Sequence, residues 1–322
     1  MSRKTKTWFT VAASLTLIGF IIFGGAMTII KWDFSRLSTV KYETESHEIN
    51  EIFEDISIVT DTADIEFAIS ESGKTTVVCR EETKAKHSVA VKDGTLTVEL
   101  EDARKWYDHF RININFDTPK ITVYLPADEY GALSVNGKTC HAKIAADFSF
   151  ESIDVNLTTG NIKNHASASD AIKLKTETGS ISVENASAGS FELSTATGTI
   201  NAHSLSCAGA FSVKVNTGKL NAENTTCKSF SSSGKTGDIT LKSVISEEKF
   251  SVERSTGSVK LDGCDASEIF IKTGTGSVTG TLLSEKTFLA KSGTGSIEVP
   301  HGTSGGKCEI STGTGDIRIS LK

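Results

Sequence analysis

The feature that most constrains the fold is a tetrapeptide, Thr-Gly, one polar residue, then Ile, Val or Leu, which recurs nine times between residues 159 and 315. Its glycines fall every 19 or 20 residues: Gly160, Gly179, Gly198, Gly218, Gly237, Gly257, Gly276, Gly295 and Gly315. A fixed period of this size is typical of a solenoid, because one short repeat cannot bury its own apolar face and must stack on its neighbours. The repeat therefore predicts a rod of stacked coils.

Apolar residues two positions apart stand on both sides of each glycine. Around Gly198 they are Phe191 and Leu193 before the glycine and Ile200 and Ala202 after it. A period of two indicates strands, since a helix would need a period of 3.6. We expect two short strands per repeat, joined at a corner where glycine supplies a positive φ or a close backbone approach. The fold class is then all-β, a parallel β-solenoid of about ten coils of 19 to 20 residues.

Threonine precedes the corner glycine in every repeat. These residues are Thr159, Thr178, Thr197, Thr217, Thr236, Thr256, Thr275, Thr294 and Thr314. Strand alternation predicts that this column faces the interior, where the hydroxyls would bond one another or corner carbonyls and so avoid the cost of unsatisfied buried polar groups. We therefore expect a structural role for the column.

The part of the chain before these repeats contains weaker matches to the same pattern. A tenth coil runs from Leu133 to Ile144, with Cys140 in place of glycine. Degenerate matches at 56–67 and 112–123 predict an N-terminal cap, and residues 88–91 and 95–100 around Asp93-Gly94 predict an antiparallel hairpin. The expected domains are an anchor at 1–31, a linker and β cap at 32–130, and the solenoid at 131–322.

An apolar run from Trp8 to Ile30 carries no charge and is long enough, at about 35 Å as a helix, to cross a bilayer core. Arg3, Lys4 and Lys6 precede it, so the positive-inside tendency places the N-terminus in the cytoplasm and the rest outside. We expect a single-pass membrane anchor at residues 8–30. A cleaved signal peptide is the alternative.

Composition restricts the partners. The chain has 34 Lys and Arg against 40 Asp and Glu, a net charge of −6, and three of those basic residues precede the apolar run. The exported part is thus acidic, without the basic stripe that nucleic-acid binding requires, so no nucleic acid is expected as a partner.

The six cysteines fall into two groups. Cys79, Cys140, Cys264 and Cys308 occupy unrelated repeat positions and are expected to be small buried apolar groups. Cys207 and Cys227 both lie nine residues after their corner glycine on successive coils. Their Cα atoms should lie about one strand spacing apart, which permits a disulfide without requiring it.

No pattern of catalytic residues is visible, so no catalytic residue and no cofactor are expected. The sequence has no His-Glu-x-x-His, and its seven histidines are scattered. His165, Glu184 and His203 share one outward column and are the candidate metal ligands, because zinc takes imidazole and carboxylate ligands. The alternative is a solvated ladder that keeps like charges apart.

The basic start, the anchor ending in Gly24-Gly25-Ala26-Met27, the following Lys31-Trp32-Asp33-Phe34 and the Thr-Gly-Ser/Asp-Ile/Val repeats together resemble the bacterial putative-adhesin family of β-strand-repeat surface proteins. The resemblance covers nearly the whole chain. It implies a membrane-tethered, extracytoplasmic β-solenoid, common in Gram-positive bacteria and sometimes associated with cell-envelope stress systems. It implies no ligand and no active site.

These observations favour a non-enzymatic surface protein that makes weak multivalent contacts with a cell-wall polymer, another cell or an envelope protein. One alternative is a polysaccharide-processing β-helix enzyme, which would need a groove lined by charged residues. Another is a sensor or scaffold that docks partners, or a second copy of itself, through the last coil, because a strand edge at Arg318 to Lys322 would invite pairing.

Overall fold

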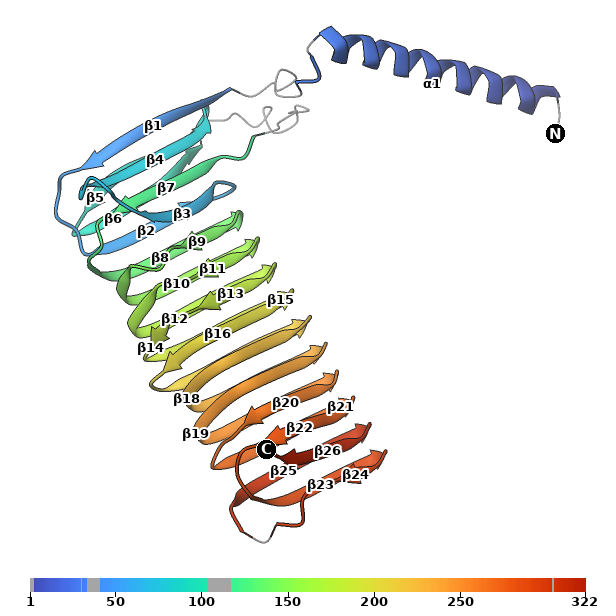
Figure 1. The fold of residues 1–322 in the computed structure, drawn as a ribbon. Coiled ribbons are helices and arrows are strands. Elements are labelled where there is room, and N and C mark those ends of the chain that lie inside the picture. Colours follow the sequence, from blue (N-terminus) through green and yellow to red (C-terminus); the bar gives the residue numbers. More distant parts are fainter. Residues whose placement is uncertain (1–2, 30, 34–40, 103–116, 303) are drawn as a thin grey trace.

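The computed structural model describes residues 3–29, 31–33, 41–102, 117–302 and 304–322. It shows one long helix, α1 (Arg3–Ile29), followed by a rod of stacked strands (Figure 1). The predicted all-β parallel solenoid is confirmed. Each coil contributes two strands, one before and one after its corner, and each strand pairs in parallel with its equivalents in the neighbouring coils.

The strand bounds follow the repeat. The cap strands are β1 (Tyr42–Ile49), β2 (Asp55–Thr60), β3 (Asp64–Ile69), β4 (Thr75–Glu82), β5 (Ala85–Lys92), β6 (Thr95–Asp102) and β7 (Lys120–Leu125). The coil strands are β8 (Glu129–Thr139), β9 (Ala142–Ile144), β10 (Ser149–Thr159), β11 (Ile162–Asn164), β12 (Ser167–Thr178), β13 (Ile181–Glu184), β14 (Ser187–Ala188), β15 (Ser190–Thr197), β16 (Ile200–Cys207), β17 (Ala210–Thr217), β18 (Leu220–Thr236), β19 (Ile239–Thr256), β20 (Val259–Cys264), β21 (Glu268–Thr275), β22 (Val278–Leu282), β23 (Lys286–Thr294), β24 (Ile297–Glu298), β25 (Gly306–Thr314) and β26 (Ile317–Leu321).

Equivalent residues lie directly over each other along the rod. Phe191, Phe211, Phe230 and Phe250 form one buried column, with ring centroids 5.7, 5.5 and 4.9 Å apart from each phenylalanine to the next. Aromatic pairs at such distances contribute about 0.5 to 1.5 kcal/mol each beyond the burial of their area. The core is therefore a continuous apolar column inside the rod.

The corner glycines have both a positive φ and a close approach to the neighbouring backbone, the two reasons for which glycine was expected there. All nine have φ between 126° and 154°, a region that favours glycine. A Cβ added to Gly179 would also lie 1.9 Å from the carbonyl oxygen of Gly160 in the coil before it. Cys140, which takes the place of the glycine in the tenth coil, is not among the residues with positive φ.

A second corner, which the sequence analysis did not identify, lies six residues after the glycine. Asn185, Ser204, Asn224, Ser243 and Gly263 occupy it in successive coils, with φ of 54°, 53°, 51°, 50° and 62°. Asn and Gly adopt this left-handed conformation more readily than other residues. The Asn, Ser and Gly residues of this column were the sequence signal from which the second corner could have been predicted.

The cap contains two further coils. Strands β2 and β3 stack on β8 and β9, which confirms the weak match at 56–67. The match at 112–123 is correct in its second half, where β7 pairs with β3, whereas β6 supplies the first arm by pairing with β2. Residues 112–114 lie outside the described residues. The β5–β6 hairpin with its Asp93-Gly94 turn is confirmed.

The last two coils are exchanged in space relative to their order in the chain. Strands β25 and β26 pair with β21 and β22 on one side and with β23 and β24 on the other. The coil of β23 and β24 therefore forms the end of the rod (Figure 1). The expected free edge at Arg318 to Lys322 is wrong for Arg318, which is paired on both sides, whereas among the described strands Ile319 to Leu321 pair only with β22.

Candidate functional site

The strand ends at the glycine corners form the most regular exposed surface of the rod. All nine threonines before the glycines are exposed, so the prediction that they face the interior is wrong. Strand alternation fails there because two consecutive residues, such as Ala196 and Thr197, both face solvent before the corner. We call the nine exposed threonines, Thr159, Thr178, Thr197, Thr217, Thr236, Thr256, Thr275, Thr294 and Thr314, the threonine ladder.

The predicted hydroxyl-to-carbonyl bonds are made by a different column, three residues before the glycine. The hydroxyl of Thr195 is buried and donates to the carbonyl of Gly179 at 3.0 Å. Thr176 and Thr273 make the same bond to Gly160 and Gly257, at 3.0 and 3.1 Å. These buried threonines therefore bond the corners of neighbouring coils to each other. The hydroxyls of the threonine ladder do not take part in these bonds.

The residue directly after the glycine stabilises the corner in several coils. Asp238 Oδ1 accepts the backbone N–H of Ser258 at 2.9 Å, and Asp316 Oδ1 accepts that of Ser296 at 2.8 Å. The backbone N–H of Ser296, and after it the Ser296 hydroxyl, donate hydrogen bonds to Asp316 and hold the pKa of its carboxyl below its usual value. Much of this polar column is thus occupied within the rod.

The threonine ladder differs in that no hydroxyl of its nine members makes a hydrogen bond to the described part of the chain. Each hydroxyl can donate one hydrogen bond and accept others. Successive coils place these groups about 4.8 Å apart, one strand spacing. The arrangement is a straight row of free donors and acceptors along one edge of the rod, where the strands that end in these threonines finish (Figure 1).

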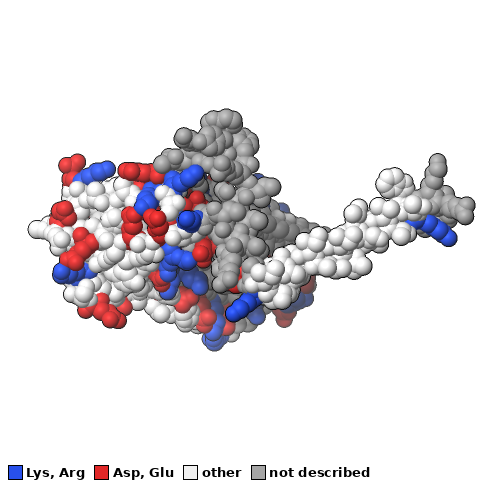
Figure 2. All heavy atoms as spheres, turned by 90° about the horizontal axis from the view of Figure 1, so that it is seen from above, with Lys and Arg blue, Asp and Glu red and all other residues white. Residues whose placement is uncertain are grey.

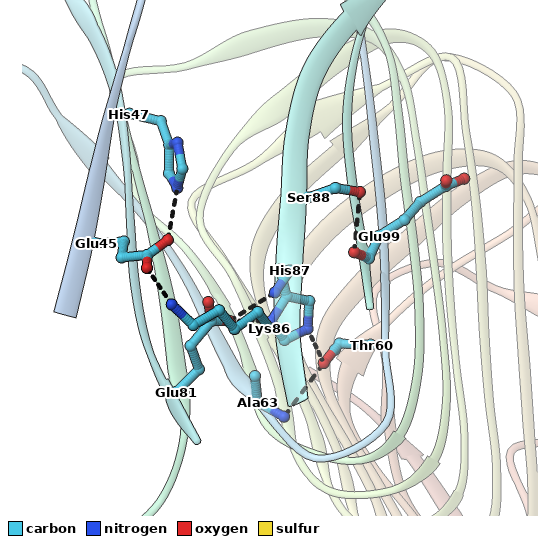
Figure 3. A network of polar contacts seen from close by, with 9 residues as sticks. All are labelled: Glu45, His47, Thr60, Ala63, Glu81, Lys86, His87, Ser88 and Glu99. Atoms are coloured by element: carbon cyan, nitrogen blue, oxygen red, sulfur yellow. Dashed lines mark hydrogen bonds and ion pairs between the residues drawn. The ribbon is translucent and has the colours of Figure 1, made fainter. Parts of the chain in front are cut away.

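A buried polar network in the cap was missed by the sequence analysis (Figure 3). His87 Nδ1 lies 2.6 Å from Glu81 Oε2, and His87 Nε2 lies 2.9 Å from the hydroxyl of Thr60. The backbone N–H of His87 also donates to Glu81 Oε2 at 2.8 Å. The three side chains come from β2, β4 and β5, and nothing in their sequence spacing indicated that they meet.

This order of hydroxyl, imidazole and carboxylate is shared with nucleophilic triads. Thr60 is only 2% exposed, and its oxygen accepts the N–H of Ala63 at 3.3 Å. The adjoining cavity, lined in part by Thr60, His87 and Pro119, measures about 20 Å³, which is room for one water molecule and no substrate. The network therefore serves to fasten three cap strands together.

The structure places Glu184 and His203 opposite each other in register on β13 and β16. Glu184 accepts a hydrogen bond from the Ser182 hydroxyl at 3.0 Å, and His203 lies 3.9 Å from Glu223. His165 lines a shallow groove of about 580 Å³ beside Asp128 and Asp147. Among the described residues, no group of three or more His, Cys, Asp or Glu side chains could hold a metal ion.

All six cysteines are buried, and Cys207 and Cys227 are free thiols in this structure. Burial raises the pKa of Cys227 to about 12 and also raises the pKa of Cys207. Because the thiolate is the reactive form, a raised pKa lowers the reactivity of both thiols. The disulfide between them stays a prediction.

Charges on the rod are mixed in sign. Acidic and basic side chains intermingle on the face seen from above, whereas the helix carries no acidic group (Figure 2). Residues Thr5–Ile29 form the single candidate membrane span among the described helices, with a mean hydropathy of 2.0. The helix is long enough and apolar enough to cross a membrane, and a signal sequence would share these two properties.

A parallel β-solenoid with stacked Thr-Gly corners and an antiparallel cap defines the class of this protein. The chain belongs to the Toastrack DUF4097 family, whose model matches residues 53–231 and 209–322. A search of curated proteins finds no match.

Three solved structures are similar in fold. One, described as a putative adhesin from Bacteroides fragilis, is 18% identical over 87% of this chain and 97% of its own, with a TM-score of 0.44. A putative adhesin from Parabacteroides distasonis is 11% identical over 87% and 98%, with a TM-score of 0.46. A putative lipid binding protein from the same species is 14% identical over 74% and 94%, with a TM-score of 0.48.

Proposed function

We propose that this protein is a non-enzymatic surface rod, anchored in the cell membrane by residues 8–30, which binds an extended polar polymer of the cell envelope along its threonine ladder. The observation that carries the proposal is the row of nine exposed hydroxyls without partners in the described chain. A wall polysaccharide is the polymer class that suits them, because it repeats along its length and offers many hydroxyl and amide groups.

Weak contacts suffice in such an arrangement. One hydrogen bond contributes only about 0.5 to 1.5 kcal/mol net. Contacts on one rigid support act together, however, because after the first contact the others form within the same complex. A stiff rod with one hydroxyl per coil therefore gains its affinity from number and regularity, and needs no deep pocket.

The test compares two sets of alanine substitutions in the full-length protein in detergent. The ladder variant carries Thr197→Ala, Thr217→Ala, Thr236→Ala and Thr256→Ala. The matched control removes as many hydroxyls from outward positions away from the corner, with Ser212→Ala, Ser231→Ala, Ser233→Ala and Ser251→Ala. Circular dichroism melts check that both fold.

Binding is measured by co-sedimentation with purified cell-wall polysaccharide. We expect at least tenfold weaker binding by the ladder variant and unchanged binding by the control. Equal losses in both variants, or no binding by the unmodified protein, would refute the proposal. Release of reducing sugar above the buffer level in the same assay would replace the non-enzymatic role with polysaccharide processing.

A second role, end-to-end association of two copies, is supported by the open end of the rod. Among the described strands, β23 pairs with β25 alone, so its other edge is free. Leu289 and Ile297 on this last coil are 54% and 46% exposed. A free strand edge with exposed apolar side chains is a template for pairing with another chain.

Light scattering of the full-length protein at increasing concentration tests this second role. The double variant Leu289→Lys and Ile297→Lys should lower the associated mass, because it places like charges opposite each other at the contact. Thr279→Lys, on β22 two coils from the open end, serves as the control and should leave the mass unchanged. Association that persists in the double variant would exclude this end as the contact.

A further inference from the structure

Arg254 occupies an interior position of the rod. It stands three residues before Gly257, in the column where Thr195 and Thr273 donate their buried hydroxyls to corner carbonyls. Its side chain is nonetheless buried, with 4% of the residue exposed. A guanidinium is charged under all ordinary conditions, so the rod contains a buried positive charge where its other coils have neutral groups.

The guanidinium is only partly satisfied by the protein. Nη1 donates to the carbonyl of Val215, two coils away. Nε and Nη2 are buried and have no hydrogen-bond partner in the described chain. No carboxylate of the described residues lies within 4.0 Å of Arg254 as an ion pair. Burial lowers the pKa of Arg254, and the charge of Asp238 opposes this effect only in part.

The neighbouring coil is adapted to this side chain. Gly234 is opposite Arg254 in register, and a Cβ added to it would lie 1.9 Å from Nη1. Ser232 lies two residues earlier on the same strand, in a column that holds Val213 and Val252 in the adjacent coils. The Ser232 hydroxyl is also buried without a partner. Gly234 therefore makes room for the guanidinium itself, and Ser232, on the strand that pairs with the strand of Arg254, is smaller than the valines of its column.

We propose that Arg254, together with Ser232 on the neighbouring strand, forms a binding site for a small monovalent anion inside the rod, and chloride is the anion we expect there. A buried charge needs a partner of opposite sign, and a buried donor needs an acceptor. A halide ion satisfies both needs and is small, and Ser232 has the smaller side chain in a column where the adjacent coils have valine. The ion would join the coils of Val215, Gly234 and Arg254 and so stabilise the middle of the rod.

Anomalous diffraction from crystals of the full-length protein grown in sodium bromide tests the site directly. We expect an anomalous bromide peak within about 3.5 Å of Arg254 Nε or Nη2, the reach of a hydrogen bond. A water molecule at this position without anomalous signal, or continuous protein density that leaves no room, would overturn the proposal.

Thermal melts provide a second readout. We compare chloride with gluconate, an anion too large for the site, at equal ionic strength. Once chloride exceeds its dissociation constant, each tenfold increase should raise the Tm of the unmodified protein by about 3 °C. Arg254→Thr restores the residue type of the column and should abolish this dependence. Arg318→Thr, which removes an exposed arginine paired with Asp316, should retain it. Identical chloride dependence in both variants, or none in the unmodified protein, would count against the site.

Discussion

At the scale of single residues, two hydroxyls that are two positions apart in several coils have opposite environments. Thr195 is buried and bonded to the carbonyl of Gly179, whereas Thr197 is exposed and has no such bond. The buried hydroxyl satisfies a corner carbonyl that faces the rod interior. The exposed hydroxyl is available to a ligand, so the same residue type serves stability at one position and recognition at the other.

This contrast predicts different costs for the same substitution. Thr195→Ala leaves the Gly179 carbonyl without its side-chain donor and should lower the free energy of unfolding by about 1 to 2 kcal/mol. Thr197→Ala should change it by less than about 0.5 kcal/mol. Urea denaturation of the two variants measures the difference, and equal effects would contradict the assignment of the two columns.

The corner glycines should tolerate no side chain. In Gly198→Ala the new Cβ would lie 1.8 Å from the Gly179 carbonyl oxygen, at a φ of 154°. Because the neighbouring backbone must move, we expect the free energy of unfolding to fall by more than about 2 kcal/mol. The same urea titration measures it, with Ala196→Ser on the adjacent exposed position as the control. A Gly198→Ala variant as stable as the unmodified protein would mean that the corner can relax.

At the scale of elements, Glu66 joins the cap to the solenoid. Its carboxylate lies 2.5 Å from Lys120 Nζ on β7 and 2.7 Å from Lys143 Nζ on β9, so it links the coils on both sides of β3. The hydrogen bond from Lys120, followed by that from Lys143, lowers the pKa of Glu66 below 4.5. The Glu66 side chain thus forms ion pairs with both neighbouring coils.

The lowered pKa of Glu66 makes the stabilisation by its two ion pairs depend on pH. A carboxyl whose pKa is lower in the folded state stabilises the protein above the unfolded pKa, here 4.5, and loses this contribution as the pH falls through the folded pKa. Glu66→Gln should therefore reduce Tm at pH 7, and this reduction should shrink as the pH falls below 4.5. Melts between pH 7 and pH 3 test this, and a constant Tm difference across the range would exclude the carboxylate as the cause.

The exchange of the last two coils predicts which engineered cysteines can be linked. Thr279 and Arg318 are direct partners on β22 and β26, so Thr279→Cys with Arg318→Cys should form a disulfide under mild oxidation. Glu298 lies on the far side of Arg318. Thr279→Cys with Glu298→Cys would be two strand spacings apart, about 9.6 Å, and should not form one. Mass spectrometry of the oxidised proteins distinguishes the two orders, since coils stacked in sequence order would give the reverse result.

At the scale of the whole molecule, the two ends of the rod differ. The N-terminal end is covered by antiparallel strands, with β4 paired to β1 and β7 and β5 paired to β6. The outermost strand there, β1, carries Glu43, Glu45 and Glu48, and such charges discourage pairing with another chain. The other end, β23 and β24, has an open edge. The molecule is therefore directional, with a closed end nearest to the apolar helix in sequence and an open end far from it.

If α1 is a membrane anchor, a charge inside it should change how the whole protein partitions between membrane and solution. Leu17→Arg places a charge in the middle of the apolar helix and should release the protein into the soluble fraction after alkaline carbonate extraction of membranes, because a charge at the bilayer centre is costly. Leu289→Arg, on the open end of the rod, should leave extraction unchanged. An intact mass that lacked residues 1–26 would show instead that the helix is a cleaved signal sequence.

The sequence by itself determined the coil, its period, its core columns and its glycine corners, because each of these follows from local chemistry repeated at a fixed spacing. It did not determine the direction of the threonine ladder, since a corner interrupts strand alternation and only the traced backbone shows where. The meeting of Thr60, Glu81 and His87 depends on how the cap strands pair. The exchange of the last two coils leaves the repeat spacing unchanged at 19 and 20 residues, so only tertiary pairing decided which coil closes the rod.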